Sequence, residues 1–387
     1  MIGREFTTTT PYAIYPRFDL AARLLQKSGN NGMAGVGVST DTLGVRARRR
    51  STVLWTTGLS AGLIVTGLIA VGTGAIAIDP ATVARIVIHQ LTGLDTGDWT
   101  PPQEAIVWQV RLPRVLLGMT VGAGLAICGV ALQAMVRNVL ADPYLLGINS
   151  GASSGAAAAI LFGAGAGFGQ YALSTSAFLG ALGASLLVFL IARSGGRMTS
   201  IRLLLAGVAV GYALYATTSF LIFASGSAEG ARSVMFWLLG SLGLARWDPL
   251  MAVTATVVAG ATLYLTVVGR RLDVLAVGDE TAHTLGVSPD RFRLRLLVVV
   301  SLAVGVLVSA SGSIGFVGLV VPHLARRIVG AAHVRVVPVS ALLGAILLVW
   351  ADVIARVLLA PQEIPIGIIT SLLGAPFLLI LIRRLHA

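Results

Sequence analysis

The sequence predicts an all-α protein that crosses a membrane many times, and three features support this prediction. Hydrophobic residues make up 56% of the 387 residues, whereas only 11% are charged. Apolar stretches of about 20 residues, which suffice to cross a bilayer core of about 30 Å, recur along most of the chain. A soluble domain of this length would need a polar surface that these residues do not provide. We therefore expect the chain to be solvated by membrane lipid.

Ten apolar stretches are predicted to be spanning helices, because a helix satisfies its own backbone hydrogen bonds in lipid. Their approximate ranges are 52–77, 113–136, 144–165, 171–193, 201–225, 248–269, 293–312, 315–330, 337–359 and 364–383. The stretch 315–330 is short and is interrupted by Gly315, Gly318 and Pro322. Such breaks are tolerated where helices contact one another or line a cavity.

Three segments outside the spans have their own character. Residues 1–50 are polar and lack the arrangement of a secretory signal, so we expect a flexible cytoplasmic tail before a membrane domain at 51–387. Residues 80–92 are predicted to form a short helix at the membrane interface. Within an amphipathic external segment, residues 231–241 are predicted to form a second short helix at the outer surface.

The net charge of +12 would suggest a nucleic-acid partner in a soluble protein. Here, the basic residues lie in short loops between apolar stretches, so membrane topology explains them and no nucleic-acid partner is expected. If the N-terminus lies inside, arginines of the inside loops outnumber those outside roughly threefold, which agrees with the positive-inside rule. Ten spans with both termini in the cytoplasm follow from this bias.

Catalytic and metal-binding patterns are weak. Two GxSxG sequences, at 58–62 and 151–155, lie in or beside predicted spans, where small residues are common, rather than between a strand and a helix. The single lysine, Lys27, precedes Ser28 but follows no glycine-rich loop, so a phosphate-binding P-loop is not expected. The histidines and the single Cys128 show no metal-ligand spacing. We expect no catalytic residue, metal or cofactor, and hence no enzyme.

Ionisable residues within the spans are also scarce. Asp352 lies four residues before Arg356, where a local salt bridge is expected, and Glu363 falls at the outer end of a span. Proton- and sodium-driven transporters usually carry more ionisable groups inside their spans. If the protein transports a cargo, this scarcity favours energy supplied by a partner.

Six short motifs follow one another along the chain. They are Arg111-Leu-Pro-Arg114, the segment from Gln133 to Gly151, the segment from Leu275 to Val287, the segment from Gly315 to His323, Ala351-Asp-Val-Ile-Ala-Arg356, and Glu363-Ile-Pro365-Ile-Gly367 leading to Gly374-Ala-Pro376. In this order and spacing, about residues 50–384 resemble the permease subunits of type II ABC importers, the family that takes up iron complexes, haem and vitamin B12.

This resemblance implies a function and a set of partners. The chain would be a homodimeric permease of the bacterial inner membrane, with two ATP-binding cassette subunits and a periplasmic substrate-binding protein. ATP would be hydrolysed by the partner, and the cargo would be an iron chelate, either haem or a ferric siderophore, or cobalamin. An ion-coupled secondary transporter and a membrane receptor without transport remain the alternatives.

The polar segment 272–290 is predicted to form two short amphipathic helices separated by a glycine turn. The resemblance implies that this segment docks in a cleft of the ATPase as a coupling element; a solvated loop is the alternative. The residues assigned to this coupling are Gly278, Asp279, Glu280, Leu285, Gly286 and Val287.

Three arginines lie at the outer ends of spans, against the positive-inside bias: Arg111, Arg114 and Arg356. The resemblance implies that they receive glutamates from the two lobes of the binding protein, and guanidinium groups suit such carboxylate pairing. The alternative is that they extend to lipid headgroups.

Two short segments are expected to form a gate on the cytoplasmic side. The resemblance assigns Asn138 and Leu140 to one segment and Ser200 and Ile201 to the other. Val139 stands where the family usually has proline, which puts the local turn geometry in doubt. A small apolar constriction is a reasonable gate, and helix capping by Asn138 or Ser200 is the alternative.

Overall fold

The computed structural model describes residues 45–385 except residue 75, residues 95–96, residue 195 and residue 197. Most of the predicted tail lies outside the described residues, and residues 45–50 belong to the first helix rather than to a tail. Ala47–Ala387 form one compact unit. The predicted boundary at residue 51 stays a prediction.

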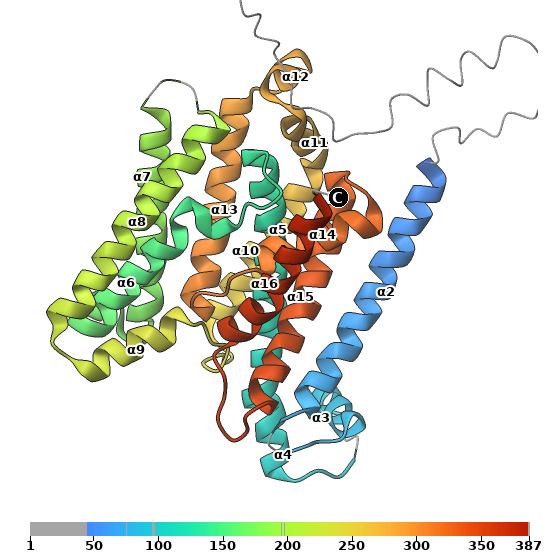
Figure 1. Cartoon of the computed structure of the whole chain (residues 1–387). Coiled ribbons are helices and arrows are strands. Elements are labelled where there is room, and N and C mark those ends of the chain that lie inside the picture. Colours follow the sequence, from blue (N-terminus) through green and yellow to red (C-terminus); the bar gives the residue numbers. More distant parts are fainter. Residues whose placement is uncertain (1–44, 75, 95–96, 195, 197, 386–387) are drawn as a thin grey trace, which may run out of the picture. The chain divides into compact units, whose positions relative to one another are not determined.

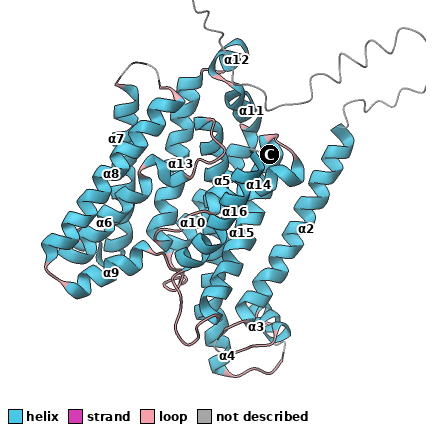
Figure 2. Cartoon of the chain, viewed as in Figure 1, coloured by secondary structure: helices cyan, strands magenta, loops and turns pink. Residues whose placement is uncertain are grey.

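The all-α class is confirmed, since every regular element of the described residues is a helix (Figures 1 and 2). The α-helices are α2 (Val45–Gly72), α3 (Pro80–Thr92), α4 (Pro101–Ala105), α5 (Leu112–Val136), α6 (Ile148–Phe162), α7 (Ala172–Arg193), α8 (Ser200–Ser225), α9 (Ala228–Leu238), α10 (Pro249–Val267), α11 (Gly269–Val277), α12 (Asp279–Thr284), α13 (Pro289–Ser311), α14 (Val317–Val329), α15 (His333–Val357) and α16 (Ile366–Leu385). A π-helical segment, Ile106–Arg111, joins α4 to α5, and short 3-10 segments precede α6 and α7.

Each predicted span contains a helix, but the helices differ in length. Seven helices of the described residues are long and apolar enough to cross a membrane. Helix α6 has 15 residues and α14 has 13. At about 1.5 Å per residue, both fall short of a bilayer core of about 30 Å. The apolar part of α16 at Ile366–Leu381 is also shorter, so the count of ten full spans stays a prediction.

Side-chain caps explain where several helices begin. Helix α3 begins at Pro80, as predicted, because the carboxylate of Asp79 accepts a hydrogen bond from the Ala81 amide at 3.0 Å. Helix α9 begins at Ala228, earlier than predicted, because the Ser227 hydroxyl accepts from the Gly230 amide at 3.0 Å. The start of α9 is therefore set by the capping residue Ser227 rather than by the first residue of the predicted range 231–241.

Helix α5 forms the centre of the bundle. Every residue from Gly124 to Val136 is buried, and α5 packs against α10, α13, α14 and α15. Helices α6, α7 and α8 form a neighbouring group, which α13 joins to α5 through its contacts with α7 (Figure 1). The central helix therefore touches no lipid along its second half.

Glycines set the closest helix contacts in the bundle. A Cβ atom added at Gly122 of α5 would overlap with the carbonyl of Gly344 in α15, and one added at Gly151 of α6 would overlap with that of Gly180 in α7. In membranes, close packing of this kind holds helices together. Ser153, the serine of one GxSxG sequence, donates to the Asn149 carbonyl within α6 at 2.8 Å, as a helical serine does.

We predict that Gly122→Ala destabilises the bundle by about 1–3 kcal/mol, because the added methyl group must separate α5 from α15. The measurement is the thermal unfolding midpoint of the purified protein in detergent. The matched control is Gly260→Ala in α10, where nothing lies within 4 Å of the added Cβ and the midpoint should stay or rise slightly. Equal midpoints for the two variants would contradict the assigned role of the glycine contact.

Candidate functional site

The predicted site residues fall at opposite ends of the bundle. The end that carries α11 and α12 is called the α12 end, and the end that carries α3 and α4 is called the α4 end (Figure 1). The predicted coupling and gate residues lie at the α12 end. The three predicted docking arginines lie at the α4 end. The structure thus brings together the members of each predicted group.

Two short helices form the predicted coupling element, α11 and α12, and a glycine separates them. Gly278 has φ 155° and ψ 162°, and Gly286, just after α12, has φ 77°. Both conformations suit glycine because a Cβ atom would be strained there. The predicted helix–glycine–helix pattern of this segment is confirmed.

The coupling element has a buried face and an exposed face. Leu272 and Leu275, both residues of α11, are fully buried. In contrast, Val277 is 70% exposed and Leu285 is 62% exposed, and Glu280 is also exposed. Exposed apolar side chains on a polar projection are typical of a protein contact. Of the other coupling residues, Gly286 is exposed, and Gly278, Asp279 and Val287 are half-buried.

Asp279 faces the bundle rather than solvent alone. Its two carboxylate oxygens accept hydrogen bonds from Arg293 of α13 at 2.6 and 3.0 Å. Arg137, which follows α5, lies 4.0 Å away. The hydrogen bond from Arg293 is the main cause that lowers the pKa of Asp279, and its charged form is thereby favoured. The sequence did not indicate this contact, which joins residues 14 positions apart.

The two predicted gate segments lie next to each other. The hydroxyl of Ser200 donates to the carbonyl of Met135 at 3.1 Å, which joins the start of α8 to the end of α5. The side chain of Asn138 accepts from the Leu140 amide at 2.9 Å in a local turn. Ile201 is 69% exposed beside them.

Helix capping, the alternative considered for Ser200, is wrong. The hydroxyl that caps α8 belongs to Thr199, which accepts from the Arg202 amide at 3.3 Å. Asn138 follows α5, and its backbone amide donates to the Gln133 carbonyl of that helix at 3.2 Å, so Asn138 takes part in closing the end of α5. The role of Asn138, Leu140, Ser200 and Ile201 in a gate stays a prediction.

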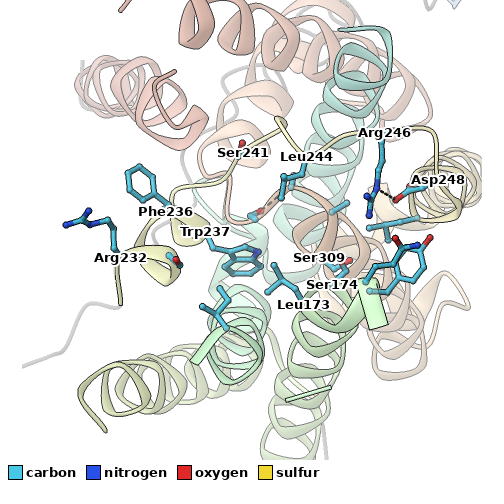
Figure 3. Close-up of a pocket in the computed structure, with 18 of the residues that line it drawn as sticks. Leu173, Ser174, Arg232, Phe236, Trp237, Ser241, Leu244, Arg246, Asp248 and Ser309 are labelled. Atoms are coloured by element: carbon cyan, nitrogen blue, oxygen red, sulfur yellow. Dashed lines mark hydrogen bonds and ion pairs between the residues drawn. The ribbon is translucent and has the colours of Figure 1, made fainter. Parts of the chain in front are cut away.

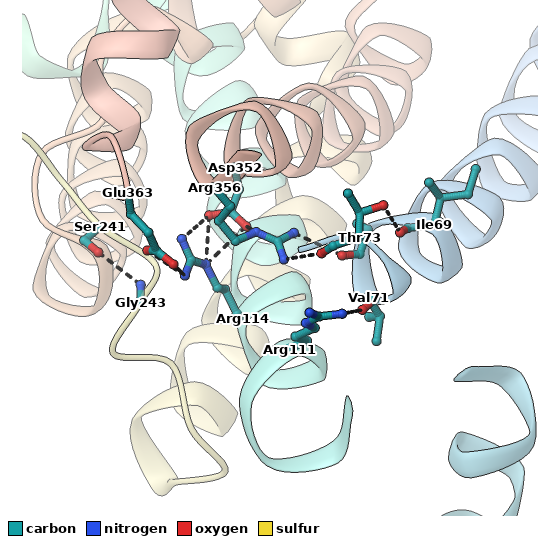
Figure 4. A network of polar contacts seen from close by, with 11 residues as sticks. Ile69, Val71, Thr73, Arg111, Arg114, Ser241, Gly243, Asp352, Arg356 and Glu363 are labelled. Atoms are coloured by element: carbon teal, nitrogen blue, oxygen red, sulfur yellow. Dashed lines mark hydrogen bonds and ion pairs between the residues drawn. The ribbon is translucent and has the colours of Figure 1, made fainter. Parts of the chain in front are cut away.

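At the α4 end, one buried carboxylate is shared by two arginines (Figure 4). Arg114 donates to Asp352 at 2.9 Å, and the Nε atom of Arg356 lies 3.0 Å from the other oxygen of Asp352. The predicted pairing of Asp352 with Arg356 is therefore confirmed. Arg114 also donates to both oxygens of Glu363, at 2.9 and 3.0 Å. The sequence did not indicate that Arg114 and Asp352, 238 positions apart, would meet.

Arg111 and Arg356 hold the end of α2. Arg111 donates to the carbonyls of Val71 and Gly72 at 3.0 and 3.1 Å, and Arg356 donates to that of Thr73 at 2.9 Å. The last carbonyls of a helix lack helical partners, so cations near them are favourable.

The three predicted docking arginines are therefore not free surface cations. Arg111, Arg114 and Arg356 are buried, and each has partners in its own chain. The lipid-headgroup alternative is not what the structure shows. Docking of a binding protein at these residues stays a prediction, and Arg114 has the most accessible partner, because the Glu363 side chain is 51% exposed.

A cavity of about 670 Å³ lies beside α9 (Figure 3). Its lining combines aromatic and aliphatic side chains, including Phe236 and Trp237, with charged ones, including Arg232. Arg246 and Asp248 form an ion pair of 3.5 Å at its border. A cavity of this size is within the usual range for small-molecule sites.

The described residues form an all-helical bundle in which seven helices are long and apolar enough to cross a membrane, which is the architecture of a multi-span membrane protein. Residues 62–384 match the FecCD transport family, and the chain belongs to this family. The chain is thus a transport permease. The resemblance inferred from the six motifs is confirmed.

Known proteins of this kind include permeases with different cargoes. The chain is 46% identical over 280 residues to a cobalamin import permease of Halobacterium salinarum, a match that covers 72% of this chain and 74% of the relative. It is 41% identical to a hemin transport permease of Yersinia pestis, over 74% of this chain and 86% of the relative. Among solved structures, a metal-chelate type ABC transporter in an inward-facing conformation matches with a TM-score of 0.74 at 34% identity, covering 85% of this chain and 98% of the other.

We predict that Asp352→Asn destabilises the bundle by about 3–5 kcal/mol, because it leaves two buried guanidinium groups without their shared counter-charge. The matched control is Glu363→Gln, which removes the half-exposed partner of Arg114 and should cost about 1 kcal/mol or less. Thermal unfolding midpoints in detergent compare the two variants. A midpoint for Asp352→Asn at or above that of Glu363→Gln would contradict a stabilising role of the shared carboxylate.

Proposed function

We propose that this chain is the membrane-spanning subunit of an ATP-driven importer. It would act as a homodimer in the bacterial inner membrane, with two ATP-binding cassette subunits on one side and a substrate-binding protein on the other. The observation that carries this proposal is the exposed coupling element formed by α11 and α12. Membership of the FecCD transport family supports it.

The proposed orientation places the α12 end, with both chain termini, in the cytoplasm. Basic residues gather on the helices at this end, and loops on the cytoplasmic side carry an excess of arginine. The basic residues on the helices at this end include Arg193, Arg270, Arg271, Arg326 and Arg327.

The contact with the ATPase would use the exposed face of the coupling element. Leu285 and Val277 would enter an apolar cleft of the partner, while Glu280 would lie at its polar rim. Closure of the two ATPase subunits would then displace α12 and rock the two permease subunits, which gives alternating access. The segments that contain Asn138–Leu140 and Ser200–Ile201 would form the gate on this side.

The proposed cargo is an iron chelate, either haem or a ferric siderophore, with cobalamin as the next choice. The names of similar permeases include cobalamin, hemin and Fe(3+)-citrate import, and one similar permease of Haemophilus influenzae imports molybdate. The cavity beside α9 would receive the cargo at the outer side. Its mixture of aromatic and basic side chains suits a flat apolar molecule that carries carboxylates.

The test is uptake by proteoliposomes that contain the permease and its cognate ATPase, with the binding protein added outside. We expect uptake of haem, a ferric siderophore or cobalamin that requires ATP, and no uptake of molybdate. Leu285→Asp should abolish uptake and release the ATPase on purification, because a charge enters the apolar contact. The control, Leu94→Asp, changes an equally exposed leucine at the α4 end and should retain the ATPase.

ATP-independent uptake driven by an ion gradient would instead indicate a secondary transporter. Binding of cargo with no uptake under either condition would indicate a receptor.

We further propose that the binding protein docks at the α4 end through a carboxylate that takes the place of Glu363 on Arg114. Arg114 is the docking arginine whose carboxylate partner reaches solvent. The inner partner, Asp352, would keep Arg114 oriented during the exchange.

Glu363→Gln should therefore tighten docking, because it removes the carboxylate that competes for Arg114. We expect a severalfold lower Kd for the cognate binding protein, and the gain should shrink as salt concentration rises. Surface-immobilised permease in nanodiscs allows this measurement. An unchanged or weaker affinity would contradict docking through Arg114.

A further inference from the structure

Arg293 is a fully buried charge whose contacts reach three separate parts of the α12 end. It lies one turn inside α13 and is 0% exposed. Every nitrogen of its guanidinium group donates a hydrogen bond. A buried charge needs such partners, since leaving one unpaired is costly.

On one side, Arg293 holds the coupling element. Two of its nitrogens donate to the two carboxylate oxygens of Asp279, the first residue of α12, at 2.6 and 3.0 Å. This arrangement is bidentate, which fixes the position of the carboxylate as well as its distance.

On the other side, Arg293 contacts the end of α5, just before the predicted gate segment Asn138–Leu140, and the second predicted gate segment at Ser200. It donates to the carbonyl of Met135 near the end of α5 at 3.3 Å, to the carbonyl of Met198 before α8 at 3.1 Å, and to the hydroxyl of Ser200 at 3.0 Å. Ser200 in turn donates to Met135. The guanidinium group is rigid and planar, so its partners on the two sides are held at fixed relative positions.

The other half of the coupling element has a different attachment. Asp273 of α11 accepts from the backbone amide of His333 at 2.9 Å and contacts its imidazole at 2.6 Å. Asp273 thus links α11, which also packs against α5, to the start of α15. The charged contact of α12 instead runs through Arg293 to α5 and α8. Gly278 lies between these two attachments, in a backbone conformation that suits glycine.

We propose that Arg293 is a positioning residue that transmits the displacement of α12 to the two gate segments. α12 would move relative to α11 about Gly278, and the contact between Asp279 and Arg293 would carry this movement to the ends of α5 and α8. This inference rests on the proposed function, because it needs a partner that displaces α12.

The test reports on the gate directly. Cys128 is the single native cysteine and is buried, so Cys128→Ala with Ile201→Cys places one reactive thiol at the exposed gate position. In proteoliposomes with the cognate ATPase, the labelling rate of this thiol by a water-soluble maleimide is compared with and without ATP and vanadate. The same samples give the rates of ATP hydrolysis and cargo uptake.

The reference is the protein that carries only Cys128→Ala and Ile201→Cys. We expect the maleimide labelling rate of this reference to change when ATP and vanadate are added. Asp279→Asn should lose the nucleotide-dependent labelling change and the uptake, and copurification of the ATPase with this variant separates a loss of transmission from a loss of docking. Arg293→Lys should behave in the same way, because one ammonium group cannot replace a fork that reaches both sides. The control Arg295→Gln changes an exposed arginine of the same helix and should respond like the reference.

Asp279→Asn decides the outcome if Arg293→Lys does not fold, since the carboxylate is partly exposed and its loss leaves Arg293 its other hydrogen-bond partners. A normal labelling response in Asp279→Asn would overturn the transmission role while the proposed importer stands. Unsubstituted permease that supports no ATP hydrolysis by its partner and takes up no cargo would overturn the proposed function, and the inference with it.

Discussion

Buried arginines paired within the chain hold the helix ends of this bundle, and the rest of the structure depends on them. Lipid offers no water to a polar group, so each charge in an apolar bundle must find partners inside the protein. Asp352 meets this need for Arg114 and Arg356 at one end. Asp279 and several backbone carbonyls meet it for Arg293 at the other.

Helix α5 is the element that both polar clusters share. Arg114 lies in the first turn of α5, and the Met135 carbonyl that Arg293 contacts lies in its last turn. Between these points its side chains are apolar or small except for buried Gln133, which accepts a hydrogen bond from Arg326 at 2.6 Å. Glycine contacts such as Gly122 with Gly344 place the helix directly against its neighbours. Dense packing of this kind resists gradual deformation, so displacements at one end favour movement of whole helices.

Exposure at the α12 end divides the predicted coupling residues into two kinds. Leu285 and Glu280 face outward, where a partner surface can reach them, whereas Asp279 faces inward toward Arg293. In the proposed importer, contact with a partner and transmission to the bundle would thus belong to residues of α12 and the residue that follows it. A six-residue helix can serve both purposes because its opposite faces are only about 10 Å apart.

Local patterns in the sequence determined the all-α class, helix α3, the helix pair around Gly278 and the pairing of Asp352 with Arg356. Each depends on residues a few positions apart, where apolar runs, caps, glycines and helical spacing act directly. The burial of Arg293 was not predictable, because Arg291, Arg293 and Arg295 are alike in a basic helix start and only the neighbouring helices select the one that faces inward. The partners of Arg111 and Arg114 were likewise decided by tertiary structure, since their contacts join segments that only the packing of α2, α5 and α15 brings together.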